Sequence, residues 1–428
     1  MTKPMNTTTP VFLVAIDIAK RQNDVLVQHP DRRREAFKVA NTRTDFCKFS
    51  AYLKSLSARC RVAFEPTADY HRAIAWHLIE SGFDVHLVSS VACARTREAI
   101  FNSRDKNDPK DAQVILHLLE AGITQRYYDP LANGHHDLQE LANTYSVIVY
   151  RRSQTLHSLK NHYLTLYFPE IERYLNSTRS AWFMRTFHRF PTPASILALS
   201  ESKFIKEAWT LIGKKHGKEQ WLKELYATAS SSVGLPVALD SIAVQMYRLV
   251  IAEYAHLTEL RDSIEQEANA QLQDNADYIC LRSIPGVGPI VALIVLAEGG
   301  DLRRFRHHRQ FLKFCGLDLA THQSGQSCGH TRLSKRGNNR LRYAFWMAAS
   351  RAIMMNENTF RAKYERYIKD DPFNADQKRK ARTAVAAKMA RVAYAVVKHG
   401  RTYRPYHESG IPDGKIPLAR AVEATSTS

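Results

Sequence analysis

The strongest constraint on the fold is the run VFLVAIDI at residues 11–18, which is apolar except for Asp17. A short apolar run bounded by polar residues is typical of a buried strand. A lone acid inside such a strand is costly to bury, so Asp17 is expected to end the strand or to have a partner. The N-terminal part of the chain is therefore expected to form around a central sheet.

Short strand and helix patterns then alternate over residues 11–130, which we expect to be one α/β domain. NDVLVQ and EAFKVAN would complete a three-stranded antiparallel meander. The later expected elements are a helix over 43–57, a strand at RVAFEPT, a helix at HRAIAWHLIESG, a strand at FDVHLVSS and a helix at DPKDAQVILHLLEAG. This order of strands and helices is that of the ribonuclease-H-like fold.

Four acids occupy special places in this order. Asp17 ends the first strand, Glu65 ends the fourth, and Asp108 and Asp111 open the last helix. Functional groups in open α/β sheets gather at strand ends, and helix residues three apart lie about 5–6 Å from each other. The four carboxylates therefore predict a metal cluster. The structural alternative is that Asp108 caps its helix and that the other acids are surface or turn residues.

The charge and the cysteine content of the chain indicate which partners it is expected to bind and in which compartment it is expected to act. Among 428 residues, 61 Lys and Arg stand against 42 acids, a net charge of +19 that is spread along the chain. A polyanion, by default nucleic acid, is the expected partner, with a membrane surface as the weaker candidate. The N-terminus has no signal-peptide core and the six cysteines show no CxxC spacing, so we expect free thiols in a reducing cytoplasm.

Residues 136–275 are expected to be helical. Two long helical patterns flank a helical insert, which suggests an antiparallel coiled-coil arm, with an ordinary helical bundle as the alternative. The near-heptad apolar positions of the second long helix are Ile242, Met246, Leu249, Tyr254, Leu257, Leu260 and Ile264. Arg151 and Arg152 on the first are candidates for contacting a phosphate backbone, or they belong to a solvated face.

Residues 278–405 carry a second set of candidates. RSIPGVGPIVALIVLAE predicts a helix–hairpin–helix-like element whose Gly286 and Gly288 expose backbone N–H groups to a DNA phosphate. A Ser-Gly loop follows, next to a basic turn that begins at Ser334. A serine beside cations is suited to attack a phosphodiester, although most such loops are only surface loops. The candidate cations for nucleic-acid binding here are Lys335, Arg336 and Arg340.

Taken in order, the motifs resemble one known family. VAIDIAK, FEPT, the D-x-x-D-A of Asp108–Ala112, PGVGPIVA, the SG loop and SKRGNNRLR are similar to those of DEDD transposases of insertion sequences, which are related to the Piv DNA invertase. The resemblance covers roughly residues 11–400. It implies an N-terminal RuvC-like domain, a coiled-coil region and a C-terminal transposase domain.

The resemblance also implies roles for single residues. Asp17, Glu65, Asp108 and Asp111 would bind Mg²⁺, with Mn²⁺ as a possible substitute. Ser324 would be the nucleophile that forms a covalent 5′-phosphoserine link to DNA, with Ser327 and Ser334 as rivals. Implied partners are donor and target DNA, a structured non-coding bridge RNA and further copies of the chain in a dimer or tetramer, acting at the bacterial nucleoid.

Two other functions remain open from the sequence. A RuvC-like structure-selective nuclease would use the same carboxylates with water as the nucleophile. A non-catalytic nucleic-acid-binding protein on a decayed nuclease fold is disfavoured by the intact acidic tetrad. Ser324→Ala separates the recombinase hypothesis from the nuclease hypothesis, because only a serine recombinase should lose strand transfer.

Overall fold

The computed structural model describes residues 11–405 except 57, 102–107, 176–180, 213–215, 321–322, 325–326, 329–331 and 357. The chain divides into two compact units, Met1–His136 and Asp137–Ser428. Asp105 lies outside the described residues. No helix in the described part of the chain is both long and apolar enough to cross a membrane.

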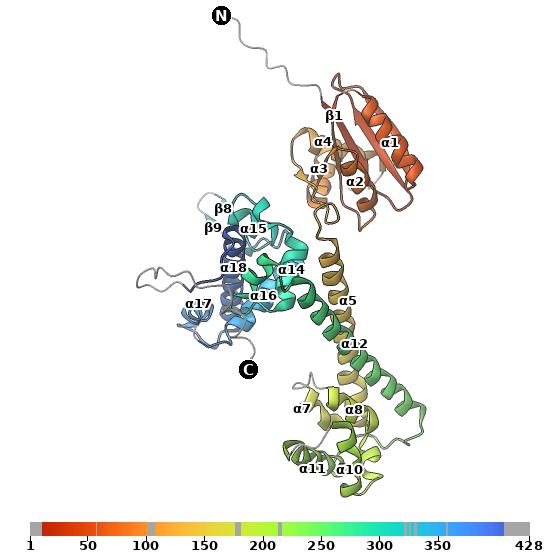
Figure 1. The fold of residues 1–428 in the computed structure, drawn as a ribbon, viewed down its shortest axis with the longest axis vertical. Helices are drawn as coiled ribbons and strands as arrows, with labels where there is room; N and C mark the ends of the chain where they lie inside the picture. The colour runs from red at the N-terminus through yellow and green to blue at the C-terminus, as the bar shows by residue number, and fades with distance from the viewer. Residues whose placement is uncertain are drawn as a thin grey trace, which may run out of the picture. The chain divides into compact units, whose positions relative to one another are not determined.

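The first unit is built on a six-stranded mixed sheet with strand order β3-β2-β1-β4-β5-β6. Figure 1 draws this sheet in the red-to-orange part of the ribbon, with β1 labelled. The strands are β1 (Val11–Asp17), β2 (Gln22–Gln28), β3 (Arg34–Ala40), β4 (Arg59–Phe64), β5 (Asp84–Leu87) and β6 (Gln125–Arg126). β1, β2 and β3 form the expected antiparallel meander, whereas β1, β4 and β5 run parallel. The central sheet and the mixed α/β architecture are therefore confirmed.

Helices cover both faces of this sheet, because alternate side chains of β1 and β4 enter two different cores. The helices are α1 (Arg43–Ser55), α2 (His71–Glu80), α3 (Ser90–Phe101) and α4 (Asp108–Glu120). Val14 and Ile16 pack with the buried residues of α1 and α2. Ala15 and Ala63 pack with those of α3 and α4 on the other face. Helix α3 and the short edge strand β6 were not anticipated from the sequence.

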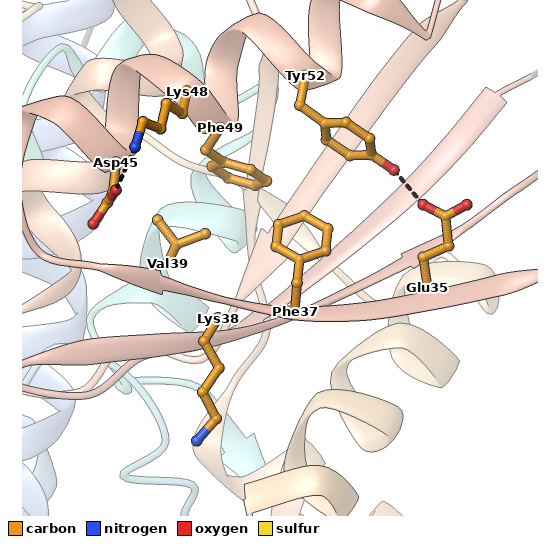
Figure 2. Close-up of a pocket in the computed structure, with 8 residues that line it drawn as sticks. All are labelled: Glu35, Phe37, Lys38, Val39, Asp45, Lys48, Phe49 and Tyr52. Carbon is orange, nitrogen blue, oxygen red and sulfur yellow. Dashed lines mark hydrogen bonds and ion pairs between the residues drawn. The ribbon is translucent and has the colours of Figure 1, made fainter.

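A pocket of about 300 Å³ lies between β3 and α1, on the face away from α4. Figure 2 shows its lining, in which the ring of Phe37 meets those of Phe49 and Tyr52 edge-on. Tyr52 donates a hydrogen bond of 2.6 Å to Glu35. Burial and this carboxylate raise the pKa of the Tyr52 hydroxyl to about 12, so it stays protonated as a structural donor. The pocket is remote from the sheet face that carries the acids discussed below.

The second unit begins with a long helix, a run of short helices and a second long helix. They are α5 (His136–Ser158), η1 (Leu159–Leu164), α6 (Thr165–Tyr167), η2 (Pro169–Ile171), α7 (Glu172–Leu175), α8 (Ala181–Arg189), α9 (Pro193–Leu197), α10 (Glu201–Ile212), α11 (His216–Ser230) and α12 (Ile242–Leu272). The short helices share a core of aromatic and aliphatic side chains with the first half of α12. The helical character expected over 136–275 is observed.

Helices α5 and α12 contact each other in antiparallel orientation. Tyr145 donates a hydrogen bond to Glu265, and Arg152 donates to Thr258 and Tyr254 farther along the pair. Rising residue numbers on one helix thus match falling numbers on the other. Coiled-coil packing itself is not confirmed.

The expected heptad stripe of α12 is wrong in the first half of the helix. Ile242, Met246 and Leu249 are exposed. Tyr247 and Ile251 are buried instead, because this half of the helix packs its other apolar face against the short-helix core. The first half of α12 has two apolar stripes, and its contact with the short-helix core determines which of them is buried.

The rest of the second unit is mainly helical. Its elements are α13 (Ala276–Arg282), α14 (Pro289–Gly299), η3 (Leu302–Arg304), α15 (His308–Phe314), β7 (Leu319–Ala320), β8 (Gln323–Ser324), β9 (Ser327–Cys328), β10 (Arg332–Leu333), α16 (Asn339–Ala352), α17 (Thr359–Ile368) and α18 (Ala375–His399). One hydrophobic core joins α13, α14, α15, α16 and α18. The basic segment after α14 forms two short helices, η3 and α15, because Asp301 and His307 each cap a new helical start.

Candidate active site

Asp17 and Glu65 lie on adjacent strands at the same edge of the sheet. β1 and β4 are parallel, with Ile16 opposite Phe64, so the next residue on each strand is Asp17 and Glu65. Neighbouring strands are about 4.7–4.9 Å apart. The two acids therefore begin as neighbours at the backbone, as expected from their positions at strand ends.

Strand alternation sets the face on which these two acids project. Ala15 and Ala63 pack into the core formed with α3 and α4, and side chains two residues apart share a face. Asp17 and Glu65 therefore project toward the α4 side. Helix α4 begins at Asp108, whose side chain is outside the described residues.

Asp111 in the first turn of α4 is buried and paired with Arg97 of α3. The Arg97 guanidinium donates through Nε at 2.7 Å and Nη2 at 2.5 Å to one carboxylate oxygen of Asp111. Only 13% of the Arg97 side chain and 4% of the Asp111 side chain are exposed. A cation thus already compensates one of the four acids, in a place where water screens little.

The thiol of Cys93, also on α3, is affected by both Glu65 and Asp111. Burial raises the pKa of the Cys93 thiol, the charge of Glu65 and a hydrogen bond to it raise it further, and Asp111 adds to this effect. Arg97 acts in the opposite direction. Two carboxylates, one directly after β4 and one on α4, thus contribute to the raised pKa of this thiol.

A fifth acid stands directly across from Asp17. Asp24 of β2 is its register partner, and like charges in this arrangement repel. Lys38 of β3 forms an ion pair of 3.7 Å with Asp24. This edge of the sheet therefore carries a fifth carboxylate that sequence reasoning did not anticipate, and Lys38 compensates its charge.

The donor chemistry suits a hard divalent cation, because it consists of carboxylate oxygens. Within the described residues no group of three or more His, Cys, Asp or Glu side chains is arranged to hold a metal ion. The Asp108 side chain is not among those residues. The four-carboxylate metal site therefore stays a prediction, supported by the shared edge and face of Asp17, Glu65 and the α4 N-terminus.

Replacing Arg97 by methionine is expected to lower the free energy of unfolding by about 3–5 kcal/mol, because it leaves Asp111 charged and buried without its partner. Urea unfolding followed by circular dichroism would measure the change. Adding Asp111→Asn to Arg97→Met should recover most of the loss, since no buried charge then remains. An Arg97→Met protein as stable as the parent would contradict a structural role for this pair.

The two glycines proposed for phosphate binding differ in their surroundings. Gly286 has a φ of +87°, and a Cβ there would lie 2.3 Å from the carbonyl oxygen of Ala348. The backbone conformation of Gly286 and its close packing against α16 therefore explain why glycine is needed there, without a role in phosphate binding. Gly288 is the N-cap of α14 and is partly exposed, and a Cβ there would meet only the Arg282 guanidinium, at 4.0 Å.

The candidate cations also divide into two groups. Arg152 is engaged with Tyr254 and Thr258 on α12, and Arg340 is bonded to Glu298 at 2.9 Å and to Asn143. These two arginines hold helices together. The other three candidates are exposed, namely Arg151, Lys335 and Arg336.

The segment that carries Ser324 connects two short strands that pair with each other. β7 and β10 pair antiparallel, with Leu319 opposite Leu333, and residues 321–331 run between them. Within that stretch β8 pairs with β9, which sets Ser324 opposite Ser327 in the backbone register. Their side chains lie outside the described residues.

Ser334, the third candidate nucleophile, has a structural bond. Its hydroxyl donates to the carboxylate of Asp318, and its backbone N–H donates to the Asp318 carbonyl at 2.9 Å. These bonds close the base of the β7–β10 pair. The nucleophile assignment itself stays a prediction.

Sequence reasoning missed the residues that support both candidate centres. Arg97 was missed because helix α3 was not predicted, although the two arginines at positions 95 and 97, shortly before the acidic start of α4, were a usable signal. Glu298 was also missed. It accepts hydrogen bonds from Asn338 and Arg340 at 2.6 and 2.9 Å, and so fixes the start of α16.

Two protein-family profiles match the chain. Residues 14–169 match a DEDD transposase profile of the IS110 type, and residues 279–365 match the profile described as "Transposase IS116/IS110/IS902 family". The two matched segments contain the predicted acids and the serine segment, respectively.

Curated relatives agree with these profiles. The chain is 33% identical over 177 residues to the transposase for insertion sequence element IS1111A of Coxiella burnetii, covering 40% of this chain and 48% of that protein. It is 23% identical over 266 residues to the IS116 uncharacterized 44.8 kDa protein of Streptomyces clavuligerus, covering 59% and 63%. The matches span about half of these relatives' own length.

Among solved structures, Thermus thermophilus RuvC in complex with a Holliday junction matches 27% of this chain and 99% of its own. The sequence identity is 11% and the TM-score is 0.20. The strand order and register of β1 to β6 define the fold of the first unit.

Proposed function

Because this chain belongs to the IS110 family of transposases, we propose that it is a DNA recombinase that cuts and rejoins donor and target DNA. The observation that carries this proposal is the meeting of Asp17 and Glu65 at one sheet edge, on the face where α4 presents Asp111. Their combination with a serine segment in the second unit favours strand transfer over simple hydrolysis.

The proposed chemistry consists of two exchanges at phosphorus. The Ser324 hydroxyl attacks the phosphodiester, so a bond forms between Oγ and phosphorus and the bond to the 3′ oxygen breaks. The serine proton leaves and the 3′ oxygen gains a proton, which yields a 5′-phosphoserine and a free 3′ hydroxyl. A 3′ hydroxyl of the other DNA then reverses the step. The bond energy is conserved, so no nucleotide hydrolysis is needed.

Asp17, Glu65, Asp108 and Asp111 would hold Mg²⁺, with Mn²⁺ as a substitute. When bound, the ion would supply charge stabilisation at the phosphoryl oxygens. Arg97 keeps Asp111 in place, and the exposed cations Lys335 and Arg336 stabilise negative charge near the serine segment. The metal and serine groups come from different units of the chain.

We further propose that a structured bridge RNA pairs with both DNAs and that the chain acts as a dimer or tetramer at the bacterial nucleoid. The net charge of +19 favours a nucleic-acid scaffold of this kind. If base pairing with RNA selects the sites, few direct base contacts by the protein are needed.

A covalent-trapping assay tests the proposal. The full chain is incubated with Mg²⁺, its co-purifying RNA and donor-junction DNA, and the products are separated on a denaturing gel. A label at the 3′ end of the cut strand should migrate with the protein, whereas a label at the 5′ end should be released. Chelation of the divalent ion is the matched control and should abolish the adduct.

The same gel distinguishes the alternative function. A RuvC-like nuclease with water as nucleophile would release both labels on free DNA fragments and leave no protein-bound DNA. Cleavage without an adduct would therefore replace the recombinase proposal by the nuclease one.

A further inference from the structure

A pocket of about 320 Å³ opens beside helix α16 in the second unit. Buried Leu317 and Ala386 line its apolar part. Tyr343 and Trp346 of α16 also line it, with ring planes 14° apart and centroids 6.4 Å apart. They remain 58% and 39% exposed, so two large parallel rings face solvent beside a hollow. Exposed apolar surface next to a hollow is a candidate binding site.

The same pocket carries positive charge. Lys335 and Arg342 line it, and no carboxylate does so among the described lining residues. The Arg342 guanidinium donates to the carbonyl oxygens of Cys315 and Lys335 at 3.3 Å each, which holds it in place. Lys335 adopts a φ of +53°, a backbone conformation that non-glycine residues avoid unless the surroundings enforce it.

We propose that this pocket binds an unpaired nucleotide of the DNA strand that is cut, with its base on the Tyr343 and Trp346 rings and its phosphate against Lys335 and Arg342. Aromatic rings bind bases of any sequence because every base has a π face. The base must be unpaired and unstacked, since neighbouring pairs cover its faces in a duplex. The inference rests on the proposed function, which exchanges DNA strands.

The location of the pocket supports this ligand. Leu333, the last residue of β10, also lines the pocket, and β10 with β7 brackets residues 321–331. A nucleotide held here lies at the base of the segment that carries Ser324. The pocket would therefore hold the strand close to the anchored end of the segment that carries Ser324.

The test measures binding of the full chain to fluorescent oligonucleotides of about twelve nucleotides by anisotropy. Single-stranded DNA, duplex DNA and single-stranded RNA of one sequence are compared. Trp346→Ala should weaken single-stranded DNA binding roughly ten- to a hundredfold and change duplex binding little, because it removes a stacking surface. Trp346→Phe should retain most of the affinity. Trp76→Ala, at a tryptophan of α2 with a similar exposure of 40%, is the matched control and should have no effect.

Three results would overturn the inference. They are unchanged single-stranded DNA binding in Trp346→Ala, an equal loss for the duplex, and a loss confined to RNA, which would assign the pocket to RNA instead. The covalent-trapping assay separates this inference from the proposed function. An adduct with no effect of Trp346→Ala on binding rejects only the pocket, whereas a specific binding loss with no adduct rejects only the serine chemistry.

Discussion

Asp17→Asn is expected to slow DNA cleavage roughly a thousandfold while leaving folding and DNA binding nearly unchanged. The substitution keeps the size of the side chain but removes one charged ligand, and the charge stabilisation that a catalytic metal supplies is worth several kcal/mol, at about 1.4 kcal/mol per tenfold in rate. Asp17 is the last residue of β1 and is partly exposed, so the substitution leaves the backbone pairing of the strand in place. Single-turnover cleavage of labelled donor DNA measures the rate.

Asp84→Asn is the matched control for this experiment. Asp84 starts β5 of the same sheet, opposite Arg61 near the other end of β4, and forms ion pairs with Arg59 and Arg61 at 3.2 and 3.5 Å. Its cleavage rate should stay near that of the parent. Equal losses in both variants would mean that sheet stability, and not a metal ligand at the β1 edge, explains the effect.

Ser324→Ala is expected to abolish the protein–DNA adduct completely, because alanine has no oxygen with which to form the phosphoserine bond. Ser327→Ala and Ser334→Ala are the internal controls. Ser327 is the register partner of Ser324, so its substitution tests the same strand pair. Ser334 is bonded to Asp318, so its loss should destabilise the base of the segment without removing the nucleophile.

The denaturing gel with the 3′ label reads out all three serine variants. An adduct that persists in Ser324→Ala and disappears in Ser327→Ala would identify Ser327, and not Ser324, as the nucleophile. Cleavage that persists in Ser324→Ala without any adduct would favour water as the nucleophile. Thermal unfolding of each variant shows whether a lost adduct reflects chemistry or a lost fold.

Sequence reasoning found the parts of the fold whose pattern is strong and local. β1, β2 and β4 are apolar runs, and α4 has a clear acidic start, so these elements were predictable from periodicity and end signals. Helix α3 was missed because Cys93 is its one buried residue in the structure, which leaves little amphipathic signal. β6 has two residues and exists only through pairing with β5, which no local pattern reveals.

The candidate site was predictable to a similar extent. The position of Asp17 and Glu65 at strand ends follows from strand boundaries, and parallel pairing of β1 with β4 then makes them neighbours. The partner of Asp111 was not predictable, because it is contributed by α3 through a tertiary contact. Likewise, the sequence does not reveal that Tyr343 and Trp346 are exposed, because large aromatic side chains are usually buried. Their exposure depends on the fold.

The anchored strand pair β7–β10 limits how far the serine can travel. Ser324 follows Ala320 by four residues, and a chain extends at most about 3.3–3.6 Å per residue, so its Cα stays within about 14 Å of that of Ala320. In the proposed reaction the acids of residues 1–136 must therefore approach a serine whose Cα lies within that distance of the end of β7, whether they come from the same chain or from another copy. A single distance, measured between spin labels near Glu65 and Ala320 on assembled DNA, thus becomes a criterion for a cleavage-competent complex.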